Sequence, residues 1–168
     1  YDVPVTGDWT ADELDRIERL IDDVRPGERL LVNDGAVRML VVDRSADDIT
    51  CRVTAGGLIT SSKGINLPDT ALSLDPLTER DRELVRWAVE HDLDFLALSF
   101  VEAATDVAML RDLLCELGDG SGPCIRVVAK VERPQAVDDI EAIAQVADAI
   151  MVARGDLGVE MDLSLIHI

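Results

Sequence analysis

Charged residues follow two apolar segments in the second half of the chain. Lys130 and Glu132 come after residues 125–129, and Asp156 comes after residues 149–153. Two carboxylates can hold a hard divalent cation such as Mg2+ through oxygen, and they leave positions open for substrate oxygens and water. A lysine beside such a cation can neutralise charge on a phosphoryl group in transfer. These residue types therefore favour metal-dependent phosphoryl transfer, with a simple ion pair and an ordinary turn as the structural alternative.

The elements that must position these residues can be predicted from the apolar pattern. Side chains alternate between the two faces of a strand, so Lys130 and Glu132 should share one face. Residues 135–146 have the period of a helix packed on a sheet, with an apolar stripe made of Val137, Ile140, Ile143 and Ala144. Residues 149–153 are typical of a parallel strand buried on both faces. Because sites in parallel α/β proteins gather at the carboxyl ends of strands, all three charged residues should meet there.

A glycine and two lysines add to this candidate site. Gly155 precedes Asp156, and without a Cβ it would let backbone amides approach an anion closely. Lys63 and Lys130 are the only lysines among 16 basic residues, the others being arginines. A lysine ammonium is a compact point charge, whereas arginine is a planar fork, so retention of lysine at these two positions suggests a specific role.

Composition excludes several classes of function. The chain has 34 acidic and 16 basic residues, a formal net charge of −18, which opposes binding to nucleic acid or to a membrane surface. Aromatic residues make up only 3% of the chain, too few for a surface on which bases stack. No apolar run approaches the length of a transmembrane helix, and we expect a cytoplasmic protein. The three cysteines, Cys51, Cys115 and Cys124, lack metal-site spacing and are expected to be reduced thiols.

The first part of the chain is predicted to be rich in β-structure. After a short amphipathic helix, turn residues, the first of them Asn33-Asp34-Gly35, separate short β-type runs, as in a small antiparallel barrel or sandwich. The predicted strands are residues 29–32, 37–42, 49–53 and 57–60.

The second part alternates strands and helices. Thr78 and Asp81 are predicted to cap a helix, a strand follows at residues 95–100, and a helix follows at about residues 105–117. Together with the segments around Lys130, this gives three strand-helix repeats that fit one arc of a (β/α)8 barrel.

Residues 150–160, preceded by Ala129-Lys130-Val131-Glu132, closely resemble the active-site signature of pyruvate kinase. Two further stretches resemble the same family, Lys63-Gly64-Ile65-Asn66-Leu67-Pro68 and Leu98-Ser99-Phe100-Val101. The resemblance covers roughly residues 34–161. Glu102 departs from it, since the family commonly has a basic residue there, and so do Arg133-Pro134-Gln135 and residues 162–168.

The resemblance implies a role for each matched residue. Lys130 would be the catalytic lysine, and Glu132 and Asp156 would be the protein ligands of Mg2+ or Mn2+. The backbone amides around Gly155 and Asp156 would hold the substrate carboxylate. Phe100 would line the substrate pocket, and Lys63 would contact nucleotide phosphates.

The resemblance also implies an architecture and a reaction. Residues 1–73 would be a small antiparallel β-barrel lid domain, truncated at its N-terminus, and residues 74–168 a partial (β/α)8 TIM barrel with the metal and substrate site. The reaction would be the glycolytic transfer of phosphoryl from phosphoenolpyruvate to ADP, giving pyruvate and ATP. The family's K+ ligands would lie outside this chain, the full-length protein would be a homotetramer, and the isolated chain is expected to be inactive or nearly so.

Two other functions stay open at this point. Metal-dependent aldolases or lyases that act on 2-oxo acids also place a Glu and an Asp on magnesium. Lys63 and the predicted β lid favour the kinase, because an aldolase needs no nucleotide clamp. A binding module that keeps the lid and has lost turnover is the non-enzyme alternative.

Overall fold

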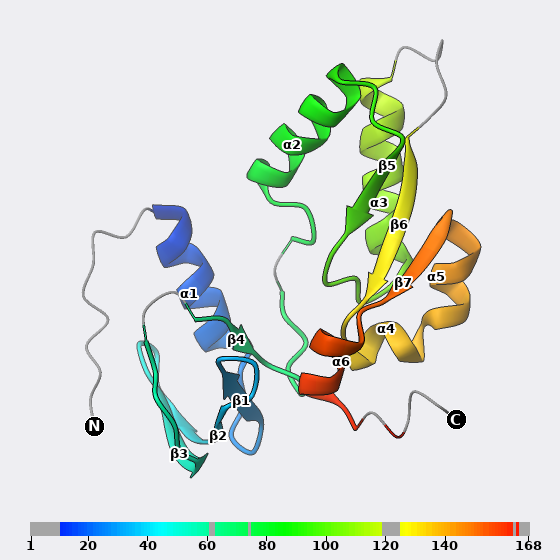
Figure 1. Ribbon diagram of the computed structural model, residues 1–168. Coiled ribbons are helices and arrows are strands. Elements are labelled where there is room, and N and C mark those ends of the chain that lie inside the picture. Colours follow the sequence, from blue (N-terminus) through cyan, green and yellow to red (C-terminus); the bar gives the residue numbers. More distant parts are fainter. Residues whose placement is uncertain (1–10, 61–62, 74, 119–124, 163, 165–168) are drawn as a thin grey trace. The chain divides into compact units, whose positions relative to one another are not determined.

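The chain forms two compact units, Tyr1–Leu74 and Asp75–Ile168, which we call the N-terminal and C-terminal units. The computed structural model describes residues 11–60, 63–73, 75–118, 125–162 and 164. Both units combine helices with a sheet, which confirms the mixed α/β class (Figure 1). No helix in the described ranges has the length and apolarity needed to cross a membrane.

The N-terminal unit is a helix with a four-stranded antiparallel sheet. Its sheet order is β3-β2-β1-β4. Asn33 and Asp34 have positive φ, a conformation that short polar side chains tolerate, and they make the predicted turn between the first two strands. The elements are α1 (Ala11–Asp23), β1 (Arg29–Val32), β2 (Val37–Arg44), β3 (Ile49–Ala55) and β4 (Ile65–Asn66).

One expectation for the N-terminal unit needs correction, and another is not confirmed. Residues 57–60 form no strand, and Leu58 and Ile59 are exposed, because no partner strand pairs with them; β4 takes the fourth place in the sheet instead. The described sheet is also open, since β3 and β4 are its two edges. A closed β-barrel lid is therefore not confirmed.

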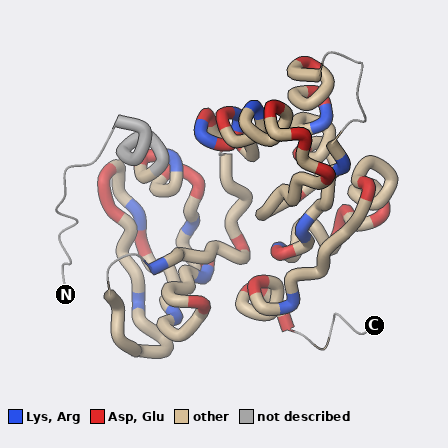
Figure 2. The backbone as a smooth tube through the Cα atoms, turned by 45° about the horizontal axis from the view of Figure 1, so that its top comes forward, with Lys and Arg blue, Asp and Glu red and all other residues tan. Residues whose placement is uncertain are grey.

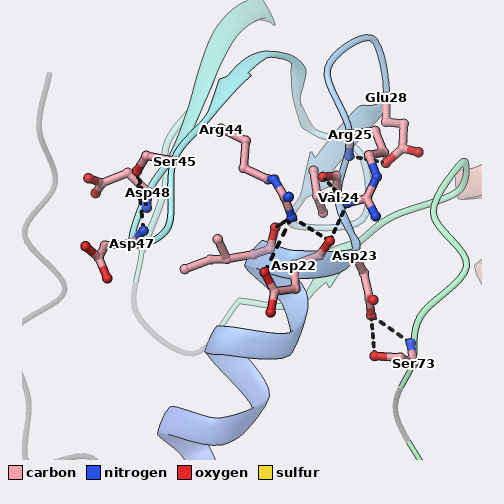
Figure 3. A network of polar contacts seen from close by, with 11 residues as sticks. Asp22, Asp23, Val24, Arg25, Glu28, Arg44, Ser45, Asp47, Asp48 and Ser73 are labelled. Atoms are coloured by element: carbon pink, nitrogen blue, oxygen red, sulfur yellow. Dashed lines mark hydrogen bonds and ion pairs between the residues drawn. The ribbon is translucent and has the colours of Figure 1, made fainter.

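Polar contacts hold the C-terminal end of α1 in the N-terminal unit. Arg44, on β2, donates from Nη1 to the carbonyl oxygens of Ile21 at 2.9 Å and Asp22 at 2.5 Å, which are carbonyls of the last turn of α1 (Figure 3). Asp23 accepts hydrogen bonds from the backbone N–H and the hydroxyl of Ser73, at 2.7 and 3.0 Å. The helix end is thus held from two sides by groups that water also reaches.

The C-terminal unit is built on three parallel strands in the order β5-β6-β7. Helix α3 packs against β6 and against α2 and α5 (Figure 1). Acidic and basic residues are interspersed along α2 (Figure 2). The elements are α2 (Glu79–Glu90), β5 (Phe95–Leu98), α3 (Ala104–Leu117), β6 (Arg126–Val131), α4 (Pro134–Asp138), α5 (Ile140–Val146), β7 (Ala149–Val152) and α6 (Arg154–Glu160).

One face of β6 belongs to the core of the C-terminal unit. Val127, Ala129 and Val131 are almost fully buried in the same apolar cluster as Ile143 and Leu157. Burying apolar area of this kind, at roughly 25 cal/mol per Å2, is what holds the helices on the sheet. The alternation sends Val128 and Lys130 to the opposite face.

The predicted cap of α2 is confirmed. The Thr78 side chain accepts a hydrogen bond from the Asp81 N–H, and the Asp81 carboxylate accepts one from the Thr78 N–H. This reciprocal pair satisfies two backbone donors at the helix start, so the short sequence pattern was sufficient to place it.

Three expectations for the C-terminal unit are corrected. Residues 135–146 form two helices, α4 and α5, because the chain breaks at Asp139, whose carboxylate accepts a hydrogen bond from the Ala104 N–H at 2.8 Å. Ala144 is exposed, outside the predicted apolar stripe. Strand β7 is largely exposed instead of buried on both faces, because it is an edge of the described sheet and pairs with β6 alone. A closed (β/α)8 barrel is likewise not shown.

The described cysteines are not cross-linked. Cys51 and Cys115 are free thiols, and Cys124 lies outside the described residues. Burial raises the pKa of the Cys51 thiol, which makes this group less reactive at neutral pH.

Candidate functional site

Lys130 and Glu132 form an ion pair at the carboxyl end of β6. The Lys130 Nζ lies 2.5 Å from Glu132 Oε1, and the side chains are 23% and 2% exposed. The expectation that they point the same way is confirmed, because Val131 between them turns into the core. A partly accessible cation is thus held by a buried carboxylate.

The loop between β5 and α3 completes the surroundings of this ion pair. Leu98 on β5 is in register with Ala129 on β6, which brings the next residue, Ser99, beside Lys130. The Ser99 Oγ accepts a hydrogen bond from Lys130 Nζ at 3.0 Å. Glu132 uses its other oxygen, Oε2, to accept from the backbone N–H of Phe100 at 2.8 Å. Both charged groups are therefore oriented by the loop that follows the neighbouring strand.

Phe100 has an unusual backbone conformation. Its φ is +55°, in the left-handed region that a bulky residue rarely adopts, and its ring is exposed. Such a conformation persists only where the surroundings fix it, and here the hydrogen bond to Glu132 does so. In the structure Phe100 contributes its amide to the site; a substrate contact through its ring stays a prediction.

Gly155 and Asp156 lie in the first turn of α6, which directly follows β7. Both are exposed, and a Cβ built at Gly155 would meet no heavy atom within 4 Å. The chain's own packing therefore does not require glycine at this position. Within the described residues, no three His, Cys, Asp or Glu side chains gather closely enough to hold a metal ion by themselves. The meeting of Asp156 with Lys130 and Glu132 around a shared ion stays a prediction.

A second set of charges, which we call the arginine cluster, lies beside the Lys130–Glu132 pair. It consists of Glu102, Arg133 and Glu160. Arg133 pairs through Nη1 with Glu102 Oε1, and its Nε lies 3.4 Å from Glu160 Oε2. Burial raises the pKa of the Glu102 carboxyl; the Arg133 charge opposes this, and Asp106 and Glu160 reinforce it.

Lys63 belongs to the N-terminal unit. It is exposed, just before β4, and the next residue, Gly64, accepts a hydrogen bond at its carbonyl from the Asn33 N–H at 3.2 Å. The backbone beside Lys63 is thus tied to the turn between β1 and β2. Its contact with nucleotide stays a prediction.

Sequence reasoning missed Ser99 and the arginine cluster as parts of this region. The strand register could have indicated Ser99, since adjacent parallel strands bring their carboxyl-terminal residues together. Glu102 was noticed only as a departure from a family pattern. Its partner Arg133 was not identifiable, because a pairing between a loop and a residue 31 positions later leaves no local pattern.

The arrangement suits chemistry in which negative charge develops. An ammonium held at fixed distances from a carboxylate and a hydroxyl needs little rearrangement to stabilise an anion that approaches it. Strand ends of a parallel sheet are the usual place for such a group.

Comparison with known proteins identifies the family. Residues 10–168 match the family model described as pyruvate kinase, barrel domain. The pyruvate kinase of Corynebacterium efficiens is 41% identical over 165 residues, covering 96% of this chain and 34% of the relative. That of Mycobacterium tuberculosis is 41% identical over 146 residues, covering 87% and 30%, and one from Agrobacterium vitis is 44% identical over 138 residues, covering 82% and 28%.

The chain spans about a third of the length of these curated relatives. The matched range extends over both units and includes the segments around Lys63, Lys130 and Asp156. The family model and the three relatives all carry the name pyruvate kinase. The chain belongs to the pyruvate kinase family.

Proposed function

We propose that this chain carries the catalytic lysine and the metal carboxylates of a pyruvate kinase, which transfers phosphoryl from phosphoenolpyruvate to ADP and yields pyruvate and ATP. The observation that carries the proposal is the position of Lys130 Nζ, 2.5 Å from Glu132 and 3.0 Å from Ser99 at a parallel strand end, in a chain of this family. The reaction is a step of glycolysis, and we expect it in the cytoplasm, in a homotetramer.

Lys130 is the residue that meets the transferring phosphoryl group. Its ammonium neutralises the charge on the equatorial oxygens as the group passes from the enolate oxygen of phosphoenolpyruvate, which leaves, to the terminal phosphate oxygen of ADP. Glu132 and Ser99 keep the ammonium in place, so the reaction does not have to reorganise it. The 23% exposure of Lys130 leaves it accessible to substrate.

Glu132 and Asp156 are the proposed protein ligands of Mg2+ or Mn2+. The donor set fits this ion, because Mg2+ is commonly held by one or two carboxylates with waters and substrate oxygens in its other positions. Glu132 is an ionisable side chain only 2% exposed, and each of its oxygens can accept more than the single hydrogen bond already made. When bound, the ion supplies Lewis-acid neutralisation of the substrate oxygens. The K+ of the family has its ligands outside this chain.

The remaining roles complete the proposal. The backbone amides around Gly155 and Asp156 hold the substrate carboxylate, Phe100 lines the pocket, and Lys63 contacts nucleotide phosphates. The C-terminal unit, at about residues 74–168, is an arc of a (β/α)8 barrel, and the N-terminal unit is the lid domain. The open space at Gly155 and the exposure of Lys63 support these roles.

A chimera tests the proposal directly. Residues 34–161 replace the matching segment of the Corynebacterium efficiens relative, and pyruvate formation is followed with lactate dehydrogenase and NADH. We expect an active chimera whose kcat falls roughly 100- to 1,000-fold in Lys130→Gln. Arg126→Gln is the matched control, since it removes a cation from the other end of β6, where Arg126 lies 4.0 Å from the ring centroid of Phe95. A Lys130→Gln chimera with unchanged kcat would falsify the role of Lys130.

The isolated chain provides two further checks. We expect the purified 168 residues to form no ATP at a measurable rate, and robust Mg-dependent ATP formation in a coupled assay would contradict this. ADP binding that weakens in Lys63→Ala would separate a kinase from an enzyme without a nucleotide clamp.

A further inference from the structure

The roles proposed above leave the arginine cluster unused. The Arg133 side chain is 6% exposed and the Glu160 side chain 4%, so one guanidinium lies buried between two carboxylates, with Glu102 the more accessible at 29%. Buried ionic groups cost desolvation free energy, and apolar residues of the same volume are often at least as stable. Stability alone therefore does not explain this cluster.

Each member of the cluster comes from a different segment beside the strand ends. Glu102 lies in the loop between β5 and α3, Arg133 directly follows Glu132, and Glu160 is the last residue of α6. The planar guanidinium has donors on two sides, so it can pair with both segments at once, which a lysine ammonium does less well. Arg133 thus joins the segment of Ser99 and Phe100 to the helix of Gly155 and Asp156.

The β5–α3 loop meets the end of β6 at three points. Ser99 accepts from Lys130, the Phe100 N–H donates to Glu132, and Glu102 pairs with Arg133. The first two contacts hold Lys130 and Glu132, the charged groups of the proposed site. The third contact involves neither of these two residues.

The far end of the loop is fixed separately. The Asp106 carboxylate accepts hydrogen bonds from the backbone N–H groups of Glu102 and Ala103, at 2.8 and 3.0 Å. The left-handed conformation of Phe100 lies between these fixed points. Contacts on both sides are what such a conformation requires to persist.

We propose that Arg133 is a positioning residue. Through Glu102 and Glu160 it holds the β5–α3 loop and α6 in the places from which Ser99 and Phe100 orient Lys130 and Glu132. This role depends on the proposed function, because it assigns Arg133 to the same site.

Four variants of the 168-residue chain separate positioning from simple stability. Arg133→Met removes the cation that pairs with both Glu102 and Glu160. Arg133→Lys keeps the positive charge but lacks the planar guanidinium that can pair on two sides. The triple variant Glu102→Gln, Arg133→Met, Glu160→Gln removes the Arg133 cation together with the two carboxylate charges that pair with it, so it should recover stability relative to Arg133→Met. Arg111→Met is the matched control, an arginine of the same unit whose partner Asp148 lies just before β7, at the opposite end of the strands.

Two readouts report on the site without turnover. Hydrogen exchange of the Phe100 amide, followed by NMR, measures the bond to Glu132, and electron paramagnetic resonance with Mn2+ as the probe measures metal affinity. We expect Arg133→Met to speed Phe100 exchange about tenfold and to weaken Mn2+ binding about 10- to 100-fold, as for other groups that orient a metal ligand. The triple variant should show both the faster exchange and the weaker Mn2+ binding despite its recovered stability. Arg133→Lys should show smaller changes in both, and Arg111→Met should show no change in either.

The outcomes decide between the two ideas. Normal Phe100 exchange in the triple variant, or equal losses in Arg111→Met, would overturn the positioning role. If the wild-type chain binds Mn2+ no more tightly than the Glu132→Gln variant does, the result counts against the proposed metal site alone. The rate of Phe100 exchange then still decides the role of Arg133.

Discussion

Arginine–carboxylate pairs occur in both units, but their surroundings differ. In the N-terminal unit, Arg29 donates from Nε to Asp69 Oδ2 at 2.8 Å and from Nη2 to Asp69 Oδ1 at 2.6 Å. The two side chains are 51% and 35% exposed. In the C-terminal unit, Arg133 lies buried between Glu102 and Glu160. The better geometry is thus in the exposed pair.

The difference indicates which charges are structural and which are candidates for function. An exposed pair costs little to form and contributes little, because water and salt screen it. A buried cluster carries a desolvation cost that its own attraction barely offsets, so its presence needs another reason. Burial, more than bond length, therefore distinguishes the arginine cluster from the exposed Arg29–Asp69 pair.

The largest effect is expected at the buried cluster. Arg133→Met leaves the Glu102 and Glu160 carboxylates without the cation between them, so the free energy of unfolding of the C-terminal unit should fall by about 3–5 kcal/mol. Urea unfolding read from NMR signals of that unit measures it. If the free energy of unfolding falls by less than about 1 kcal/mol, which is the range for exposed ion pairs, the cluster behaves like a solvent-exposed ion pair.

An intermediate effect is expected at Arg111, which is half-buried. Its Nε donates to the Val146 carbonyl at 2.6 Å, and its Nη2 lies 2.6 Å from Asp148, which also accepts from the Val127 N–H at 2.8 Å. Arg111→Met should cost about 1–2 kcal/mol, because the charged hydrogen bonds are lost while Asp148 keeps its backbone partner. The same unfolding experiment should rank it between Arg133→Met and the next variant. A loss equal to that of Arg133→Met would remove burial as the explanation.

A small effect is expected at the exposed pair. Arg29→Met should lower the free energy of unfolding of the N-terminal unit by less than about 1 kcal/mol, since the backbone N–H of residue 29 can still donate to Asp69. Repeating the measurement at high salt should shrink the difference from wild type further. A loss larger than about 1 kcal/mol, the upper end of the range for exposed pairs, or a loss that high salt does not reduce, would contradict the comparison at its exposed end.

Much of the fold could be predicted because it depends on local patterns. The strand predicted at residues 29–32 is observed, and the one predicted at residues 125–129 is observed as β6, Arg126–Val131. These strands, the turn at residues 33–35 and the cap at Thr78 follow from alternation, turn residues and capping chemistry. What failed depends on partners distant in sequence. Residues 57–60 have strand-like composition without a neighbour to pair with, and β7 is apolar but pairs on one edge only.

The candidate site was predictable to a similar extent. The period of a strand sufficed to put Lys130 and Glu132 together. The break at Asp139 and the pairing of Arg133 with Glu102 and Glu160 were not predictable, because each depends on a contact with a segment more than 20 residues away. Period-based reasoning finds residues on one element and misses those that join two.

The smallest expected effect concerns pH. The contributions of Asp69 and Glu102 to the free energy of unfolding should change with pH in opposite directions. Arg29 lowers the pKa of the Asp69 carboxyl, so this group stabilises the N-terminal unit above its ordinary pKa and loses that contribution as the pH falls through the lowered value. Burial, offset in part by Arg133, raises the pKa of the Glu102 carboxyl. Its contribution to the C-terminal unit is therefore complete below the ordinary pKa and is lost as the pH rises through the raised value.

Asp69→Asn and Glu102→Gln isolate these two contributions. The free energy of unfolding of each unit, measured at several pH values from about 3 to 7, is compared with that of its variant. The difference in free energy of unfolding between wild type and variant should grow with pH for Asp69→Asn and shrink with pH for Glu102→Gln. In an Arg29→Met background the pH dependence for Asp69→Asn should be flatter, because Arg29 lowers the pKa of the Asp69 carboxyl. Equal signs for the two carboxyls would mean that Arg133 outweighs burial at Glu102, and the arginine cluster would then be one more stabilising ion pair, like its exposed counterpart.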